Sequence, residues 1–241
     1  MRWAIISDIH SNYEALTAVL SALSKERIDQ YLCTGDIVGY GAEPDRCIAE
    51  IRKLNPVIVA GNHDWAGVGL FEETSFTDNA TSAIVWTREH LNEDSRQFLK
   101  SLVLVYEGSG ITLVHSSLHQ PEKFDYIFTL FSAEKTFHLL KTKICFIGHS
   151  HAPLIFINKG KKCSVHFQSH MKLEKECAYI VNVGSVGQPR DGDPRAAYAV
   201  YDSERDSIEI KRVDYDIPQA QEKIIQAGLP EILARRLAVG K

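Results

Sequence analysis

The sequence lacks several features that define large classes of proteins. No apolar run approaches the ~20 residues that a membrane-spanning helix needs, so we expect no membrane span. The five cysteines are odd in number, scattered, and contain no C-x-x-C pair. No signal-peptide pattern precedes the first predicted strand, which begins almost at Met1. Together these features indicate a reducing, cytoplasmic setting.

The sequence also lacks a strong excess of charge of either sign. The formal net charge of −4 gives no electrostatic reason to expect non-specific nucleic-acid binding. A nucleotide held by metal ions remains compatible with it. The 241 residues suit one large α/β domain, with or without a small appendage. Because no repeat, low-complexity tract or linker marks a boundary, we predict a single domain over residues 1–241.

Strands and helices alternate in the first quarter of the chain. Strands are predicted over 2–7, 31–34 and 56–60, and helices over 12–26 (capped by Asn12) and 43–54. This order favours right-handed βαβ units and a mainly parallel sheet core. In such sheets, ligands bind at the carboxyl ends of the strands.

The rest of the chain is predicted to be helical in the middle and strand-rich toward the end. Predicted helices cover 77–91, 94–102 (capped by Asp94), 132–141 (capped by Ser132) and one or two segments of 218–241. Predicted strands cover 103–106, 111–114, 144–147, 154–157, 164–167, 178–183, 196–201 and 207–213, with a hairpin turn at 158–162. We expect the strands after residue 154 to form a second, mostly antiparallel sheet.

Polar residues with metal-ligand chemistry follow the strands, at Asp8, His10, Asp36, Asn62, His63, His115, His149 and His151. Oxygen and nitrogen ligands without thiolate favour Mn²⁺, Fe²⁺, Zn²⁺ or Ni²⁺. Without His63, which is left to the substrate, seven candidate ligands remain, more than one such ion needs, so two ions are implied. Paired ions clamp the attacking and leaving oxygens of a phosphoryl transfer and lower the pKa of bound water.

The spacing of these residues suggests which of them bind metal and which contacts the substrate. Asp8 and His10 are two residues apart, so an extended backbone places both on one side, and His149 and His151 repeat that spacing. Asn62 can bind a metal only through its amide oxygen. The adjacent His63 must point elsewhere in an extended chain, which leaves it available to the substrate.

The order D-x-H, G-D, G-N-H-D, H, G-H-x-H resembles that of the calcineurin-like metallophosphoesterases. The segments 7–12, 35–41 and 183–190 are similar to those of the small bacterial and archaeal phosphodiesterase-type branch. The resemblance implies an α/β fold with four αββα layers, in which helices flank two facing mixed sheets. Small departures from the usual motifs, such as Ser150 in place of threonine, remove no candidate ligand.

The resemblance also implies a role for each residue of the site. Asp8, His10 and His151 would hold one metal ion; Asn62, His115 and His149 would hold the other, with Asp36 as the bridge. His63, oriented by Asp64, would protonate or electrostatically stabilise the leaving oxygen.

The activity implied is in-line attack by a metal-bridging hydroxide on a small-molecule phosphoester. Diesters are favoured over monoesters, and manganese is favoured as the metal. Nucleotide-type substrates and a phosphoprotein both remain open. Arg190 either pairs with a neighbouring aspartate or contacts the substrate phosphate. A retromer subunit shares this fold and acts as a non-catalytic scaffold, but the complete ligand set and His63 favour an enzyme. Oligomeric state is not predicted.

Overall fold

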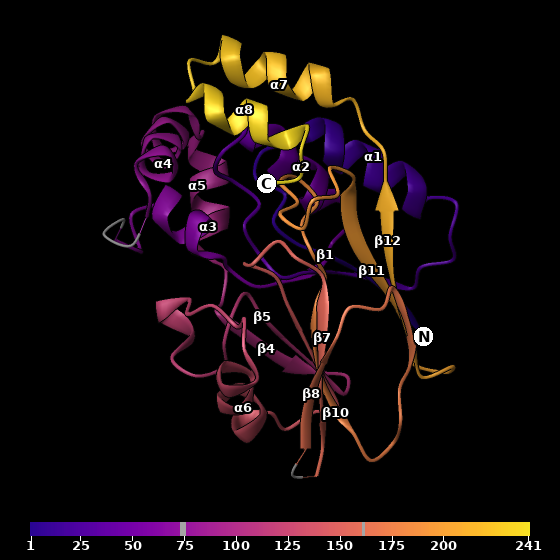
Figure 1. The fold of residues 1–241 in the computed structure, drawn as a ribbon. Coiled ribbons are helices and arrows are strands. Elements are labelled where there is room, and N and C mark those ends of the chain that lie inside the picture. The colour runs from indigo at the N-terminus through magenta and orange to yellow at the C-terminus, as the bar shows by residue number, and fades with distance from the viewer. Residues whose placement is uncertain (73–75, 161) are drawn as a thin grey trace.

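The computed structural model describes residues 1–72, 76–160 and 162–241, and two six-stranded sheets form its centre (Figure 1). The first sheet has the order β3 (Val57–Ile58), β2 (Gln30–Cys33), β1 (Arg2–Ile6), β11 (Ala196–Asp202), β12 (Ser207–Val213) and β9 (His170–Lys172). The second has the order β4 (Val105–Gly108), β5 (Ile111–Val114), β6 (Ile144–Ile147), β10 (Ala178–Asn182), β7 (Leu154–Lys159) and β8 (Lys162–His166). Both sheets are mixed, because each contains parallel and antiparallel pairs.

The central strands of each sheet are buried on both faces. One face packs against the other sheet, and the other face packs against helices, which gives four layers. Trp3 and Ile5 of β1 face the core between the sheets, whereas Ala4 and Ile6 pack beneath α1 (Tyr13–Leu23) and α2 (Pro44–Lys53). Strand β6 repeats this alternation: 144 and 146 lie between the sheets, and 145 and 147 lie beneath α6 (Leu130–Leu139). Successive side chains of a strand point to opposite faces, so helices must cover both outer faces. The predicted αββα fold is confirmed.

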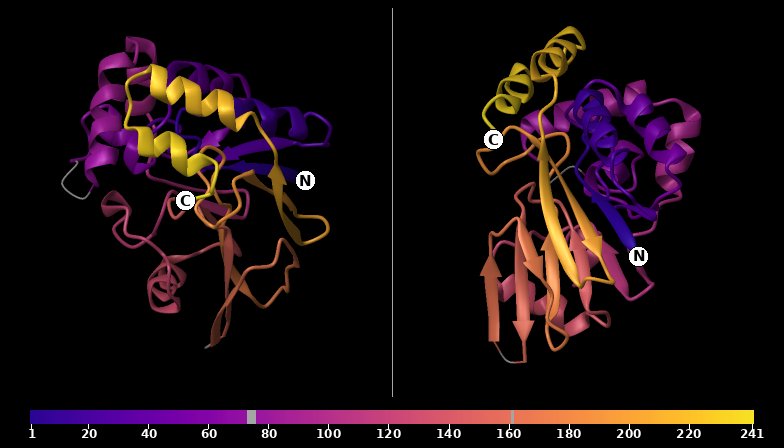
Figure 2. Two further views of the ribbon diagram at one scale, coloured as in Figure 1. Left: turned by 45° about the horizontal axis from the view of Figure 1, so that its top comes forward. Right: turned by 90° about the vertical axis from the view of Figure 1, so that its right-hand side faces the viewer.

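The remaining helices gather at one end of the molecule. They are α3 (Asn62–Gly67), α4 (Asp78–His90), α5 (Glu93–Lys100), α7 (Ile217–Gln226) and α8 (Glu231–Leu237). A short 3₁₀ turn, η2 (Pro121–Lys123), lies between β5 and α6 in the chain. Residues of α4, α7 and α8 share a small core of their own. Both views of Figure 2 place the yellow pair α7 and α8 at the same end as the indigo α1. Within the described residues, no helix is both long enough and apolar enough to cross a membrane.

Two predicted helix caps are wrong, and one is right. Asn12 caps α1, since its side chain accepts a hydrogen bond from the N–H of Ala15 at 3.0 Å. Helix α5 is capped by Asn92 instead of Asp94. Helix α6 is capped by Thr129 instead of Ser132, which lies in its first turn. In both helices, a residue two or three positions before the predicted cap accepts a hydrogen bond from a free N–H group of the first turn.

The prediction that the last strands form a sheet of their own is wrong. Strands β7, β8 and β10 join β6 in the second sheet, and β10 pairs with β6 in parallel. Strands β11 and β12 return to the first sheet, where β11 pairs antiparallel with β1. Alternation of apolar residues identifies a strand but not its partner. Residue 161, within the predicted hairpin turn, lies outside the described residues.

Parallel pairing positions the site. Strands β1, β2 and β3 run parallel in the first sheet, as do β5, β6 and β10 in the second. The loops that follow these strands carry the polar residues singled out from the sequence. Both sheets therefore deliver side chains to one shared edge.

Candidate metal centre

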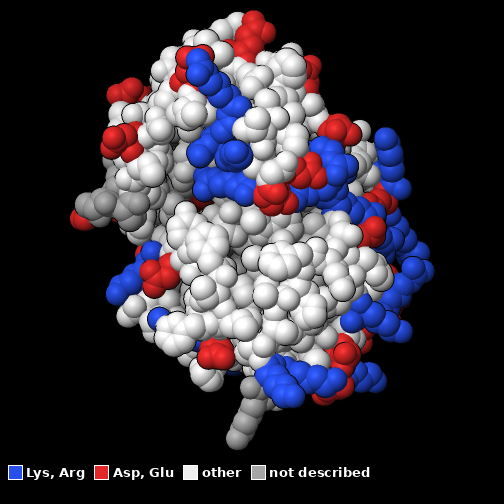
Figure 3. All heavy atoms as spheres, viewed as in Figure 1, with Lys and Arg blue, Asp and Glu red and all other residues white. Residues whose placement is uncertain are grey.

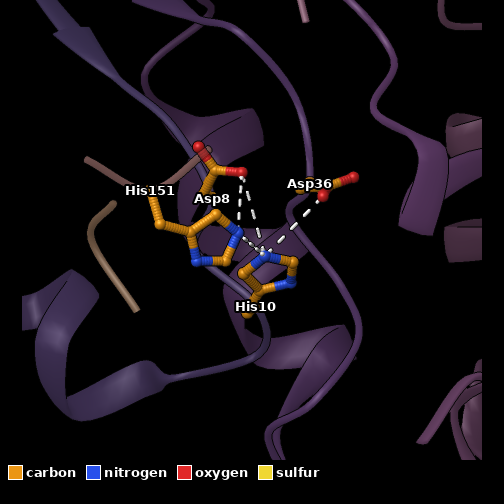
Figure 4. A group of neighbouring side chains, drawn as sticks. All are labelled: Asp8, His10, Asp36 and His151. Carbon is orange, nitrogen blue, oxygen red and sulfur yellow. Dashed lines mark hydrogen bonds and ion pairs between the residues drawn. The ribbon is translucent and has the colours of Figure 1, made fainter. Parts of the chain in front are cut away.

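Two groups of potential ligands lie at the shared edge of the sheets. Asp8, His10, Asp36 and His151 form one group, whose ligand atoms all lie within 4.8 Å of one another (Figure 4). Asp36, His115 and His149 form the second group under the same criterion. Asp36 belongs to both.

The first group converges on one small volume. The Nε2 atom of His10 lies 3.1 Å from Nε2 of His151 and 3.6 Å from Oδ2 of Asp36. Nε2 of His151 lies 3.3 Å from Oδ1 of Asp8. Figure 4 shows the two imidazoles and the Asp8 carboxylate facing one another, with Asp36 opposite. Ligand atoms of one ion must converge in this way.

Unpartnered buried atoms mark the second group. Nε2 of His115 lies 3.3 Å from Oδ2 of Asp36. Among the buried side-chain atoms that have no hydrogen-bond partner within the described residues, four lie here: Asp36 Oδ2, Asn62 Oδ1, His115 Nε2 and His149 Nε2. Buried polar atoms are normally paired, and all four belong to predicted ligands. A divalent cation would satisfy them, so the residues present fit a metal site.

Backbone carbonyls fix the orientation of three imidazoles. The Nδ1 atoms of His10, His115 and His151 lie 3.0, 2.7 and 2.6 Å from the carbonyl oxygens of Val38, Thr34 and Gln188, respectively. An Nδ1–H that donates to a carbonyl leaves Nε2 with a free lone pair. Each ring therefore presents its metal-binding nitrogen to the site.

The electrostatics of the site are those of buried, interacting charges. Burial raises the pKa of Asp8 to about 7, although nearby His115 acts in the opposite direction. Burial alone lowers the pKa of His115, but the Asp36 and Asp8 carboxylates outweigh it and raise the value to about 9. Metal ligands must be deprotonated, so a cation that binds at such a site displaces the protons from these side chains.

The loops that carry the ligands are not extended, contrary to the prediction from residue spacing. Asp8, His10, Asp36, His149 and His151 have φ angles of 51°, 49°, 54°, 67° and 59°. This left-handed conformation is uncommon outside glycine and costs on the order of 1–3 kcal/mol per residue. The chain turns sharply as it leaves each strand, which brings His10 and His151 together.

His63 and Asn62 diverge because they begin a helix, not because the chain is extended as predicted. They are the first two residues of α3, and neighbouring helical residues point ~100° apart. The His63 ring packs against Tyr40 at 4.5 Å, His10 at 4.8 Å and Phe76 at 4.8 Å between ring centroids. Burial lowers the pKa of His63 to about 4.

The hydrogen bonds of the Asp64 carboxylate within the described residues come from the backbone and not from the His63 ring, so the predicted direct orientation stays a prediction. The carboxylate of Asp64 accepts hydrogen bonds from the backbone N–H groups of Asp36, Ile37, Val38 and Gly61 at 2.8, 2.8, 3.3 and 3.0 Å. Nδ1 of His63 has no partner among the described residues. Asp64 therefore anchors the loop after β2 to α3.

Gly61 allows the two loops to approach closely. Its φ of −96° is one that any residue adopts, so the backbone conformation does not require glycine here. A side chain at this position would overlap the Asp36 carboxylate and come within 2.5 Å of the Asp36 amide nitrogen. Glycine is required here for space.

A cavity of about 180 Å³ adjoins the second group, and the sequence analysis missed most of its lining. Its walls are formed by Asn62, Phe71, Phe76, Lys123, Phe124, Asp125, Tyr126 and His149. The ring of Tyr126 stacks on His149 with 3.9 Å between centroids. The available signal was a concentration of aromatic residues in segments without predicted structure.

Arg190 lies at the edge of the site and does not pair with Asp191. Its guanidinium donates to Oε1 of Gln188 at 2.7 Å and lies 5.5 Å from the ring centroid of Tyr40. Asp191 pairs with Arg212 instead. Of the two readings left open by the sequence, the local ion pair is therefore not formed.

Known proteins share both the sequence and the fold. The family described as the calcineurin-like phosphoesterase superfamily domain matches residues 1–206. An uncharacterized protein of Methanocaldococcus jannaschii is 40% identical over 242 residues, which covers 99% of this chain and 98% of the relative. A metallophosphoesterase from Sphaerobacter thermophilus is 38% identical in its crystal structure, with a TM-score of 0.90 and coverage of 100% of this chain and 99% of that one.

A hypothetical protein from Pyrococcus horikoshii OT3 shares the fold at 22% identity, with a TM-score of 0.82 and coverage of 100% of this chain and 98% of its own. The resemblance inferred from the motifs is confirmed by the family match and by these structures. The chain therefore belongs to the calcineurin-like phosphoesterase superfamily, a metal-dependent family, and is a phosphoester hydrolase.

Proposed function

We propose that this protein hydrolyses phosphodiesters with two divalent metal ions. The observation that carries the proposal is the pair of buried ligand groups that share Asp36, with His63 beside them. When bound, two such ions supply an activated water and neutralise charge on the phosphoryl oxygens. The oxygen and nitrogen donors fit Mn, Fe, Zn or Ni, and we favour manganese.

Each ligand has a place in this proposal. Asp8, His10 and His151 would hold one ion, and Asn62, His115 and His149 the other. Asp36 would contribute to both, as its membership of both groups suggests.

His63 is proposed to act on the leaving oxygen. With a pKa of about 4, its imidazole is neutral near pH 7 and carries one N–H. That N–H can donate a hydrogen bond to the oxygen on which negative charge develops. Packing against Tyr40 and Phe76 holds the ring in place.

The aromatic cavity supports a diester preference. A diester carries a second organic group, and the cavity beside Asn62 and His149 offers Phe71, Phe76, Phe124 and Tyr126 as surfaces for a planar one. A nucleoside or aryl group has this shape. We therefore propose a small-molecule, nucleotide-type substrate.

We also propose one domain in a reducing, cytoplasmic setting. Ligands come from loops of both sheets, so neither sheet could form the site alone. All five cysteines are unpaired, and four of them are buried.

Metal reconstitution followed by parallel turnover measurements tests the proposal. Protein stripped with a chelator is reloaded with Mn²⁺ or Ni²⁺ and assayed with bis(p-nitrophenyl) phosphate and p-nitrophenyl phosphate. We expect a higher kcat/KM for the diester. A higher value for the monoester would overturn the diester preference. No turnover of either ester by fully loaded protein would favour the protein-interaction scaffold.

A further inference from the structure

Two arginines from distant parts of the chain meet beside the metal centre. Arg190 donates to Oε1 of Gln188 at 2.7 and 3.3 Å, and Arg236 of α8 approaches the same oxygen at 3.5 Å. Gln188 is buried, and its main-chain carbonyl oxygen lies 2.6 Å from Nδ1 of His151. The two guanidinium groups therefore share the neutral side-chain oxygen of a residue whose main chain contacts a predicted metal ligand.

Neither guanidinium has an acidic partner within the described residues. The nearby carboxylates are already engaged: Asp191 pairs with Arg212, and Asp193 with Arg195 at 2.7 Å. Nε of Arg236 is buried without a hydrogen-bond partner in the same part of the chain. Burial and the positive charge of Arg190 lower the pKa of Arg236. This uncompensated positive charge would attract an anion.

Arg190 is separated from His10 and His63 by one aromatic ring, that of Tyr40. The guanidinium of Arg190 lies over Tyr40, whose ring contacts His10 at 4.6 Å and His63 at 4.5 Å. Figure 3 shows Lys and Arg side chains gathered at upper centre, where Figure 1 places α8, directly above a wide uncharged area.

The end of the chain holds Arg236 in place. The N–H of Gly192 donates to the carbonyl of Gly240 at 3.0 Å, so the segment after α8 is docked on the loop that follows Arg190. A side chain on Gly240 would approach the backbone of Asp193 to 2.8 Å. Helix α8 lies beyond residues 1–206, which match the family. Arg236 therefore adds to the site from outside that match.

We propose that Arg190 and Arg236 form a subsite for a second phosphate of the substrate. The planar fork of arginine suits phosphate oxygens, and two forks can bind one phosphate from two directions. The substrate class would be a phosphodiester that carries a further phosphate, such as an ester of a nucleoside bisphosphate. This assignment rests on the proposed function for the adjoining metal centre.

A binding measurement tests the subsite without requiring turnover. Calorimetric titration of Mn²⁺-loaded protein compares thymidine 5′-monophosphate with deoxythymidine 3′,5′-bisphosphate. We expect the bisphosphate to bind at least about 10-fold more tightly, a factor that corresponds to ~1.4 kcal/mol. Arg236→Gln is expected to remove most of this preference, and Arg236→Lys to retain part of it.

Arg235→Gln is the matched control. Arg235 neighbours Arg236 on α8, is largely exposed, and pairs with Glu231 at 2.7 Å. It should leave the preference unchanged. Thermal unfolding verifies that each variant is folded, and the lysine variant provides the test if the glutamine variant is not.

Equal affinity of the wild type for the two nucleotides, or a preference that survives Arg236→Gln, would overturn the subsite. The result that contradicts the subsite differs from the result that contradicts the proposed diesterase activity. A bisphosphate preference in a protein that hydrolyses no ester would preserve the subsite and contradict the diesterase. Diester turnover without the preference would contradict only the subsite.

Discussion

The two carboxylate oxygens of Asp36 have different roles. Oδ1 accepts a hydrogen bond from the backbone N–H of His63 at 2.8 Å, while Oδ2 is buried and lacks a hydrogen-bond partner among the described residues. The first contact fixes the start of α3 against the loop after β2. The second atom remains available to the two ligand groups. Structure and metal binding therefore depend on different oxygens of the same residue.

Asp36→Asn should separate these roles. The amide oxygen can still accept the His63 N–H, but the negative charge available to both ligand groups is lost. We expect metal content, measured by mass spectrometry after reconstitution, to fall below that of the wild type while thermal unfolding stays cooperative. Wild-type metal content in this variant would contradict the shared role of Asp36.

His63→Ala should affect the reaction and not the metals. We expect both ions to be retained and kcat to fall by ~10²–10⁴, the usual range for loss of an acid–base group. Metal analysis and steady-state kinetics with the aryl diester check this. His138→Ala, at an exposed position of α6, is the control. Loss of metal from the His63 variant would disprove the role proposed for it.

At the scale of elements, Asp64 connects α3 to the loop that carries Asp36. Four backbone N–H groups point at its two oxygens. This arrangement requires two acceptor oxygens at position 64. An asparagine side chain has one oxygen and one NH2 group, so some of the backbone N–H groups would face another donor and lose their hydrogen bonds.

Asp64→Asn should therefore destabilise the fold and weaken metal binding without touching a ligand side chain. We expect a loss of ~2–3 kcal/mol in the free energy of unfolding, as for unsatisfied buried donors, measured by urea denaturation alongside metal content. If only kcat fell, with stability and metal content intact, the direct orientation of His63 by Asp64 would be favoured.

The sequence predicts which residues end the strands but not how the chain turns after them. Alternating burial and the order of motifs identify β1, β2, β5 and β6 and the polar residues beyond them. The left-handed conformations of His10 and His151 depend on contacts between loops far apart in the chain. Histidine is enriched among the few non-glycine residues with positive φ, but this weak preference does not indicate which histidines adopt that conformation.

At the scale of the whole molecule, the metal centre joins the two sheets. Asp8, His10, Asp36 and Asn62 follow strands of the first sheet, and His115, His149 and His151 follow strands of the second. Bound ions would link the sheets at this edge. Binding to the folded state alone adds stability in proportion to the logarithm of ligand excess.

Removal of the ions should therefore lower the melting temperature. An ion at about 100 times its Kd contributes ~2.7 kcal/mol, which for a chain of this size corresponds to about 5–10 °C. Thermal unfolding before and after chelation, and again after addition of Mn²⁺, measures the effect. An unchanged melting temperature would contradict the link between the sheets.

Long-range packing explains what sequence reasoning missed at this scale. Arg236 lies 46 positions after Arg190, and only the docking of α8 brings the two together. The aromatic cavity likewise combines residues 71 and 76 with 124 and 126. Local sequence patterns contain no information about contacts between residues so far apart in the chain, whereas the order of the motifs was sufficient to identify the family.

The position of β11 has a consequence for how the protein is made. Strand β11 lies between β1 and β12, and Met1 accepts a hydrogen bond from the N–H of Ser203. Trp3 of β1 pairs with Tyr201 of β11, 198 positions later, so β1 completes its pairing only after β11 has been synthesised. Contacts so distant in sequence slow folding, and the open edge of β1 is exposed to wrong partners during synthesis. Completion of the sheet whose loops carry Asp8, Asp36 and Asn62 is thus postponed until β11 and β12 have been synthesised.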